Sequence, residues 1–430
     1  MDEWSAPKTR RRRRCPLSEL VCQPLRLGLS WISLVMCLFV ADRTSLTAGL
    51  RPPGRVASSA LPVPGVTHFY QTYNESINFT HLAYDPSSDR MYVGASNWLY
   101  QLNGNLSVEV AVKSGPVEDS PACSPTECSG VVDVKLTNNF NKVLVIDKQS
   151  EKLIVCGSVH QGACRRHALG DIAQAEPLIA LPVAANDENS STYAFIASSR
   201  YFGTHLTSVL YVGATNSRQG PYRDMVPAIC SRSLEPGSRF FNVIEKSFSD
   251  TARVDINYHL KDYYLVNYVF GFQANDMVYF ATVQKKSHLL ALEEWGFVTR
   301  LARVCNSDPA YNTYTEVTLQ CLGPDGTDYN LLQDALLLKP GADLARHFRN
   351  DYKGKVLLGV FAASTDHTSR PTRRSAVCMF PLSEIENKFT ENIHLCYNGS
   401  VLTRDMDYIA GSIQSCPEPG VSAKHISRVQ

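Results

Sequence analysis

The chain has 430 residues, of which 44% are hydrophobic and 10% aromatic, so it contains enough apolar side chains for a sizeable core. Its formal net charge at pH 7 is +1. Proteins whose main partner is DNA or RNA carry a basic excess, so the charge balance argues against nucleic-acid binding. The length fits two domains or one large repetitive domain.

Residues 1–49 have the organisation of a secretory signal peptide with a long basic leader. A basic block at Lys8 and residues 10–14 precedes an apolar run at 27–41, and small residues follow at 47–49. The apolar run is shorter than the roughly 20 residues that a membrane-spanning helix needs, and an uncleaved signal anchor is the alternative. Residues 50–66, rich in Pro, Gly, Ala and Ser, are expected to form a flexible lead-in.

Cysteine usage agrees with a chain that lies outside the cytosol. Of the 13 cysteines, Cys15, Cys22 and Cys37 lie in the leader, and the others are expected to form disulfides. No Cys-x-x-Cys pair is present, so neither a zinc knuckle nor a thioredoxin-like redox pair is indicated. Asn-x-Ser/Thr sequences predict glycosylation at Asn74, Asn78, Asn105, Asn189 and Asn398.

A short pattern recurs along the chain, in which two bulky residues with high strand propensity are followed by small residues. It occurs at residues 92–96, 154–158, 211–215, 279–283 and 360–364. Irregular spacing with turns between the copies is typical of one supersecondary unit repeated with variable loops. In the first copy, strand-like segments at 80–84, 91–95 and 98–102 are separated by turn sequences.

Small sheets repeated around an axis form a β-propeller, in which crowded inner strands favour Gly, Ala and Ser. We therefore predict an all-β propeller, with a β-sandwich as the weaker alternative. No sixth copy follows residue 364, and the tail at 417–430 is polar without apolar periodicity. The sequence thus predicts an incomplete ring and an unstructured tail.

One helix is predicted after the last copy. Ser383 and Glu386 have the spacing of a capping box, and Ile385, Phe389 and Ile393 line one face.

The sequence contains no nucleophile elbow, phosphate loop, His-Glu-x-x-His motif or EF-hand loop. We interpret His160 as a hairpin-turn residue, and Asp405 and Asp407 as part of a solvated loop, instead of metal ligands. Residues 370–374 (Arg-Pro-Thr-Arg-Arg) match a minimal basic cleavage site, which we interpret as an exposed loop between strands. We expect no catalysis, cofactor or metal, although a propeller fold alone does not exclude a hydrolase.

Residues 152–164 (Lys-Leu-Ile-Val-Cys-Gly-Ser-Val-His-Gln-Gly-Ala-Cys) resemble the second-blade hairpin of plexin sema domains. Further similarity to this family lies at residues 79–82, 91–95, 268–272, 278–280, 303–305, 314–317, 375–378 and 396–397. The resemblance covers roughly residues 67–416. It implies a seven-bladed sema-type β-propeller, of which about five blades are present in this chain.

The resemblance also implies a disulfide pairing: Cys123 with Cys128, Cys156 with Cys164, Cys321 with Cys378, and Cys396 with Cys416. The turn between Cys156 and Cys164 independently suits a disulfide that clamps a hairpin. Cys230 has no obvious family partner, and the usual partner of Cys305 would lie beyond Gln430.

The function that the resemblance implies is semaphorin recognition by an extracellular plexin receptor domain in axon and cell guidance. Blades three and four, at about residues 192–319, would make most of the contact, and self-association is a further option. The chain would lie at the plasma membrane as part of a full-length receptor, or be secreted if it ends as given. We expect poor solubility without the missing blades, because an open array exposes sheet edges.

Other interpretations are open. The hepatocyte growth factor receptor family has a similar Cys-Gly-Ser-Val hairpin, but it carries a basic processing stretch where this chain has Gly-Pro-Asp-Gly-Thr at 323–327. Semaphorins differ in the second-blade hairpin. A- or B-class plexins fit best, and a secreted propeller hydrolase or lectin-like protein is the competing class.

Overall fold

The computed structural model describes Tyr70 and residues 77–201, 205–237, 239–247, 250–348, 354–398, 406–411 and 416. The expected signal peptide (1–49), lead-in (50–66) and tail (417–430) lie outside the described residues, as does the sequon at Asn74. In the part that is described, no helix is long and apolar enough to cross a membrane.

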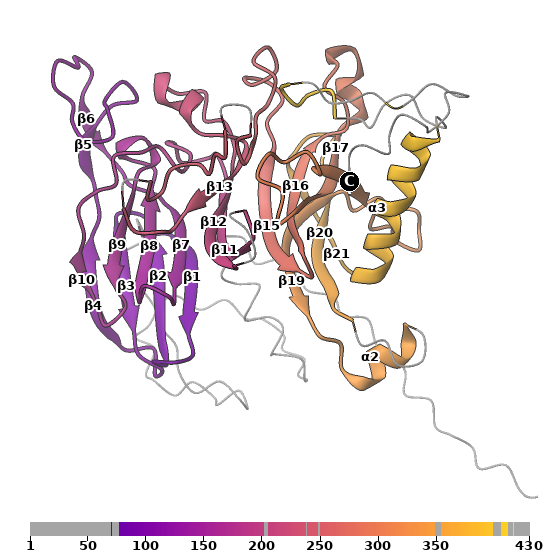
Figure 1. Cartoon of the computed structure of the whole chain (residues 1–430), viewed down its shortest axis with the longest axis horizontal. Helices are drawn as coiled ribbons and strands as arrows, with labels where there is room; N and C mark the ends of the chain where they lie inside the picture. The colour runs from indigo at the N-terminus through magenta and orange to yellow at the C-terminus, as the bar shows by residue number, and fades with distance from the viewer. Residues whose placement is uncertain are drawn as a thin grey trace, which may run out of the picture.

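Five antiparallel sheets follow one another along the chain, and Figure 1 shows them fanned out side by side. The first blade contains β1 (Phe79–Asp85), β2 (Arg90–Ala95), β3 (Trp98–Leu102) and β4 (Val108–Lys113). The second contains β7 (Asn141–Asp147), β8 (Lys152–Gly157), β9 (Cys164–Ala168) and β10 (Asp171–Ala175). A hairpin of β5 (Val117–Asp119) and β6 (Lys135–Thr137) lies between these blades in the sequence.

The next three blades follow the same chain order. The third contains β11 (Thr192–Ser199), β12 (Thr207–Ala214), β13 (Ile229–Ser233) and β14 (Arg253–Val254). The fourth contains β15 (Asn267–Ala274), β16 (Met277–Lys285), β17 (Phe297–Cys305) and β18 (Thr315–Leu319). The fifth has three strands, β19 (Leu331–Leu338), β20 (Val356–Ser364) and β21 (Pro371–Pro381), with helix α2 (Ala342–His347) between β19 and β20. The prediction of an all-β propeller with five blades is confirmed.

The recurring sequence pattern falls on the second strand of each blade, not on the innermost strand. Gly94 in β2 faces Asn141 in β7, and a Cβ atom on Gly94 would lie 2.3 Å from the Asn141 Oδ1. Likewise, a Cβ on Gly213 in β12 would lie 2.4 Å from the ring of Tyr268 in β15. The second strand therefore contains small residues, because the first strand of the next blade packs directly against it.

Buried apolar layers between neighbouring blades form the core. In β12, the successive residues Leu210 and Tyr211 point to opposite faces, because side chains alternate along a strand. Leu210 packs in the layer between blades two and three, and Tyr211 in the layer between blades three and four. Among the described residues, no buried cluster joins blade five to blade one, so the five blades form an open arc.

Helix α3 (Leu382–Tyr397) follows β21, and the capping-box prediction for it is wrong. The helix begins at Leu382 with Pro381 as its N-cap, so Ser383 already lies in the first turn. Glu386 instead reaches the fourth blade, where it accepts a hydrogen bond from Tyr279 and forms a 2.7 Å ion pair with Arg303. An interblade contact therefore outcompetes the local cap.

The strand–loop boundary near residue 370 also differs from the expectation. Residues 371–381 form strand β21, so the basic segment at 370–374 belongs mostly to a strand and not to a connecting loop. The preceding turn ends at Arg370, whose carbonyl accepts a hydrogen bond from the Thr365 N–H.

Among the described residues there are four disulfides, and they join the pairs that the family resemblance implies. Cys156–Cys164 links directly opposed residues of β8 and β9, and Cys321–Cys378 connects the segment before blade five to β21. Cys123–Cys128 closes a small loop, and Cys396 at the end of α3 is joined to Cys416. Cys230 is a buried free thiol, and Cys305 is a partly exposed one.

We predict that Phe389→Ala lowers the free energy of unfolding by about 3–5 kcal/mol, because it empties a fully buried site under α3. The Arg303 guanidinium lies 4.3 Å above the Phe389 ring and would lose this contact. Urea unfolding followed by tryptophan fluorescence measures the change.

Ile393→Ala on the same helix is the matched control. Its side chain is 42% exposed, so its cost should stay within about 0.5 kcal/mol. Equal losses for the two variants would show that α3 does not dock through Phe389.

Candidate protein-binding face

Strand direction brings a specific set of loops to one end of blades three and four. Because neighbouring strands are antiparallel, the loop after the second strand and the loop after the fourth strand emerge at the same end. These are the segments 215–228, 255–266, 286–296 and 320–330, and we call the first three the loop face. In Figure 1 the β5–β6 hairpin lies at this end of the molecule, and α2 lies at the opposite end.

Ion pairs connect the first two segments of the loop face. Arg223 in segment 215–228 lies 3.4 Å from Asp262, and Lys261 lies 3.1 Å from Asp224. Each surface pair contributes only about 0–1 kcal/mol, so their main effect is to fix the relative orientation of the two segments.

Tyrosine hydroxyls connect the second and third segments. Tyr263 donates a 2.9 Å hydrogen bond to the His288 carbonyl, and Tyr264 donates one of 2.9 Å to the Lys285 carbonyl. The Lys285 ammonium also lies 5.8 Å from the centre of the Tyr263 ring. The three segments thus form one linked surface that exists without a ligand.

A buried polar cluster supports the loop face from below. Arg300 and Glu316 form a 3.1 Å ion pair on β17 and β18, and Glu316 also accepts hydrogen bonds from Tyr314 and Tyr408. Burial is the largest single effect and lowers the pKa of Arg300, but Glu316, Tyr408 and Tyr264 together raise this pKa by more. Burial and the Glu316 charge also raise the pKa of Tyr408. Arg300 therefore keeps its charge, and Tyr408 remains a hydrogen-bond donor.

Residues 406–411 extend this support. The Tyr408 carbonyl accepts from the Asn257 N–H, and the Ala410 N–H donates to the Asp255 carbonyl, each at 2.8 Å. The Tyr408 ring packs against Tyr264 with 4.6 Å between centres. A segment distant in sequence therefore fixes the backbone of 255–266.

The loop face presents large apolar side chains to solvent. Tyr258 is 77% exposed and Leu290 is 66% exposed, and the others are Met225, Leu289 and Trp295. Aromatic residues and methionine are enriched at protein interfaces and supply most hot spots, whereas isolated exposed leucines are ordinary. Exposed aromatic groups on a braced surface therefore favour a protein-binding role for these loops.

Comparison with known proteins identifies the family of the chain. A profile of the Sema domain matches residues 332–418. Human Plexin-A2 is 31% identical over 390 residues, which cover 84% of this chain and 20% of that protein. Zebrafish (Danio rerio) Plexin-A4 is 31% identical over 374 residues, covering 81% of this chain and 19% of the relative. The solved extracellular region of plexin A4, domains 1 to 8, superimposes with a TM-score of 0.66 at 26% identity, covering 80% of this chain and 38% of that one.

The chain carries a plexin-type sema domain. It spans about one fifth of the length of the curated relatives that it matches. The similarity covers most of the chain and agrees with the family that the sequence motifs indicated.

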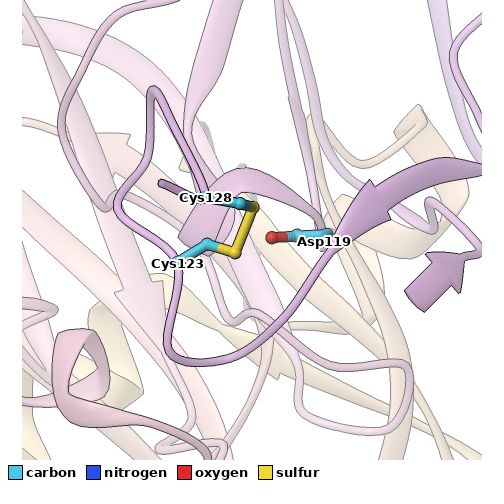
Figure 2. A group of neighbouring side chains, drawn as sticks. All are labelled: Asp119, Cys123 and Cys128. Carbon is cyan, nitrogen blue, oxygen red and sulfur yellow. A yellow bond between two sulfur atoms is a disulfide. The ribbon is translucent and has the colours of Figure 1, made fainter. Parts of the chain in front are cut away.

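One group in the sema domain has the composition of a metal site, but its chemistry does not fit a metal. Figure 2 shows Asp119 beside Cys123 and Cys128, whose sulfurs are joined in a disulfide. Thiolates bind metals, and a disulfide offers none. The Asp119 oxygens accept hydrogen bonds from the backbone N–H groups of Ser120 and His160 at 2.8 and 2.7 Å. Asp119 therefore anchors the loop that contains His160.

The remaining site predictions are distributed over the surface. The sequon residues Asn78, Asn105, Asn189 and Asn398 are exposed. Asp407 is exposed, and Asp405 lies outside the described residues. Sequence reasoning did not identify Tyr258 or Trp295. The sequence signal that could have indicated them is the presence of large apolar residues in loop segments that are otherwise polar.

A cavity of about 600 Å³ near the inner strands contains a second group of polar side chains. Lys142 donates 2.8 Å hydrogen bonds to the carbonyls of Glu188 and Ser190, and burial lowers its pKa to about 8. His81 also lines the cavity, and burial, with the charge of Lys142, lowers its pKa to about 4. Asn78 and Asn189 lie at the same cavity, so it borders two predicted glycosylation sites.

We predict that His81 makes the domain less stable at acid pH. The unfolded chain binds a proton at His81 near pH 6.5, whereas the folded chain resists protonation until about pH 4, so stability falls as pH drops through this window. His81→Gln should reduce the fall in urea midpoint between pH 7.5 and 4.5. An identical pH dependence in the variant would contradict the assignment.

Proposed function

We propose that this chain is the semaphorin-recognising part of an extracellular plexin-like receptor and that the loop face of blades three and four makes the contact. The proposal rests on one observation above the others: three segments of a plexin-type sema domain are linked to one another and expose Tyr258 and Trp295. The region lies within the expected interval 192–319.

Because its loops are already ordered, this surface can bind a partner at a lower cost in free energy. Association costs free energy when loops must be ordered at the interface, and that cost falls if they are ordered beforehand. The ion pairs, the tyrosine hydrogen bonds and residues 406–411 hold the backbone in place without a partner. The free energy gained when the exposed aromatic side chains become buried is then offset less by the cost of ordering the loops.

The disulfides and the similarity to an extracellular plexin region support a location outside the cell. We further propose that residues 67–416 are the sema portion, that residues 1–49 direct secretion, and that the exposed sequons carry glycans. Attachment to the plasma membrane through a longer chain, and a role in axon or cell guidance, belong to the same proposal.

We predict that Tyr258→Ala and Trp295→Ala each weaken binding of a dimeric semaphorin ectodomain about 10- to 100-fold, because hot-spot truncation costs on the order of 1.4–3 kcal/mol. Surface plasmon resonance with the immobilised sema domain measures this, with the expected change in the dissociation rate.

Val108→Ala is the matched control, because Val108 is 43% exposed on the outermost strand of blade one. Its affinity should equal that of the unaltered chain. If all three variants bind alike, the contact lies elsewhere. If the unaltered chain binds no semaphorin, the recognition proposal itself fails.

A further inference from the structure

Strand β21 carries a multibasic sequence at an exposed edge. The fifth sheet has the order β19-β20-β21, so β20 pairs with one side of β21, and no described strand pairs with the other. Arg370, Arg373 and Arg374 are all exposed. An edge strand with free backbone groups can accept another extended segment as its neighbour.

The same residues lie where the pairing with β20 is interrupted. Pro371 is opposite Ser364, and the next paired residue of β21 is Ser375, opposite Ala362. Residues 372–374 therefore bulge out of the ladder without partners on β20. The Arg374 N–H donates instead to the Thr372 hydroxyl at 3.2 Å. The peptide bond between Arg373 and Arg374 can thus move away from the sheet without breaking β20–β21 ladder hydrogen bonds.

From this geometry we propose that the Arg373–Arg374 bond is a processing site for a subtilisin-like endoprotease of the secretory route. Such enzymes bind an extended segment and read basic side chains in defined pockets. Arg373 supplies the residue before the cut bond, and Arg370 supplies the basic residue three positions earlier. Water adds across the amide, leaving a carboxylate on Arg373 and an amine on Arg374.

Cleavage at this bond leaves the two pieces joined. The Cys321–Cys378 disulfide spans the cut, since Cys321 lies before it and Cys378 after it. Arg374 is held by Asp325 at 2.5 Å and by the Thr327 hydroxyl at 2.7 Å, and residues 375–381 remain paired with β20. Processing therefore converts the chain into a disulfide-linked two-chain form without dismantling blade five.

The test uses the full chain secreted from cultured cells and a purified subtilisin-like proprotein convertase. On a reducing gel the treated protein should separate into two fragments, and on a non-reducing gel it should migrate as one. N-terminal sequencing of the smaller fragment should begin at Arg374. The assignment would be overturned by cleavage at another bond, or by two separate fragments on the non-reducing gel.

Two variants define the recognition. Arg373→Gln should slow cleavage about a hundredfold or more, because a pocket built for a charged side chain leaves its own polar groups unpaired. Arg374→Gln should still be cut, because it keeps Arg370 and Arg373. Arg346→Gln, which alters an exposed arginine of α2, is the control and should be cut at the rate of the unaltered chain.

Folding and sequence effects can be separated. Circular dichroism should show unfolding temperatures that differ little between the variants, since each altered side chain is exposed and the Arg374–Asp325 pair is a surface pair. A synthetic peptide of residues 366–377 tests the sequence alone. If the convertase cuts the peptide and leaves the folded chain intact, the bulge does not present the bond and the proposal fails.

Discussion

The close approach of neighbouring blades is the constraint on which the rest of this structure depends. Gly94 and Gly213 leave no room for a side chain because Asn141 and Tyr268 occupy that space. This approach lets side chains from both faces of a blade enter continuous apolar layers, as Leu210 and Tyr211 do. The blades are then rigid supports, and the variable segments between strands can differ in length without disturbing them.

A few polar contacts attach the loop face to the rigid blades and hold its backbone in place. Glu316 of the buried Arg300–Glu316 pair accepts a hydrogen bond from Tyr408. The Tyr408 carbonyl in turn accepts one from the Asn257 N–H and orders the backbone there. Removing one partner of a buried pair usually costs far more than the pair contributes, because a charge is left without compensation. Loss of either Arg300 or Glu316 would therefore disturb both the stability of blade four and the conformation of the surface above it.

Local sequence signals predicted the architecture well, whereas contacts between distant segments escaped them. The repeated bulky–bulky–small pattern located five blades, and the hairpin at 152–164 identified the family. The capping box failed because Glu386 finds a better partner in Arg303, far away in the chain. The loop face was not predicted residue by residue, since exposure of Tyr258 depends on how 255–266 is braced, and no local motif encodes that. The basic segment at 370–374 was recognised as a motif, but its bulged strand conformation depends on pairing with β20.

The layered core also determines how a local disturbance spreads through the blades. Four of the buried clusters in the described part are shared by adjacent blades, and a fifth lies on blade one alone. The blades therefore behave as a one-dimensional array with nearest-neighbour coupling. Blade three takes part in two of these layers, one with blade two and one with blade four, and blades two and four share none. A substitution that loosens one layer should therefore weaken the two blades that share it more than the blades beyond them.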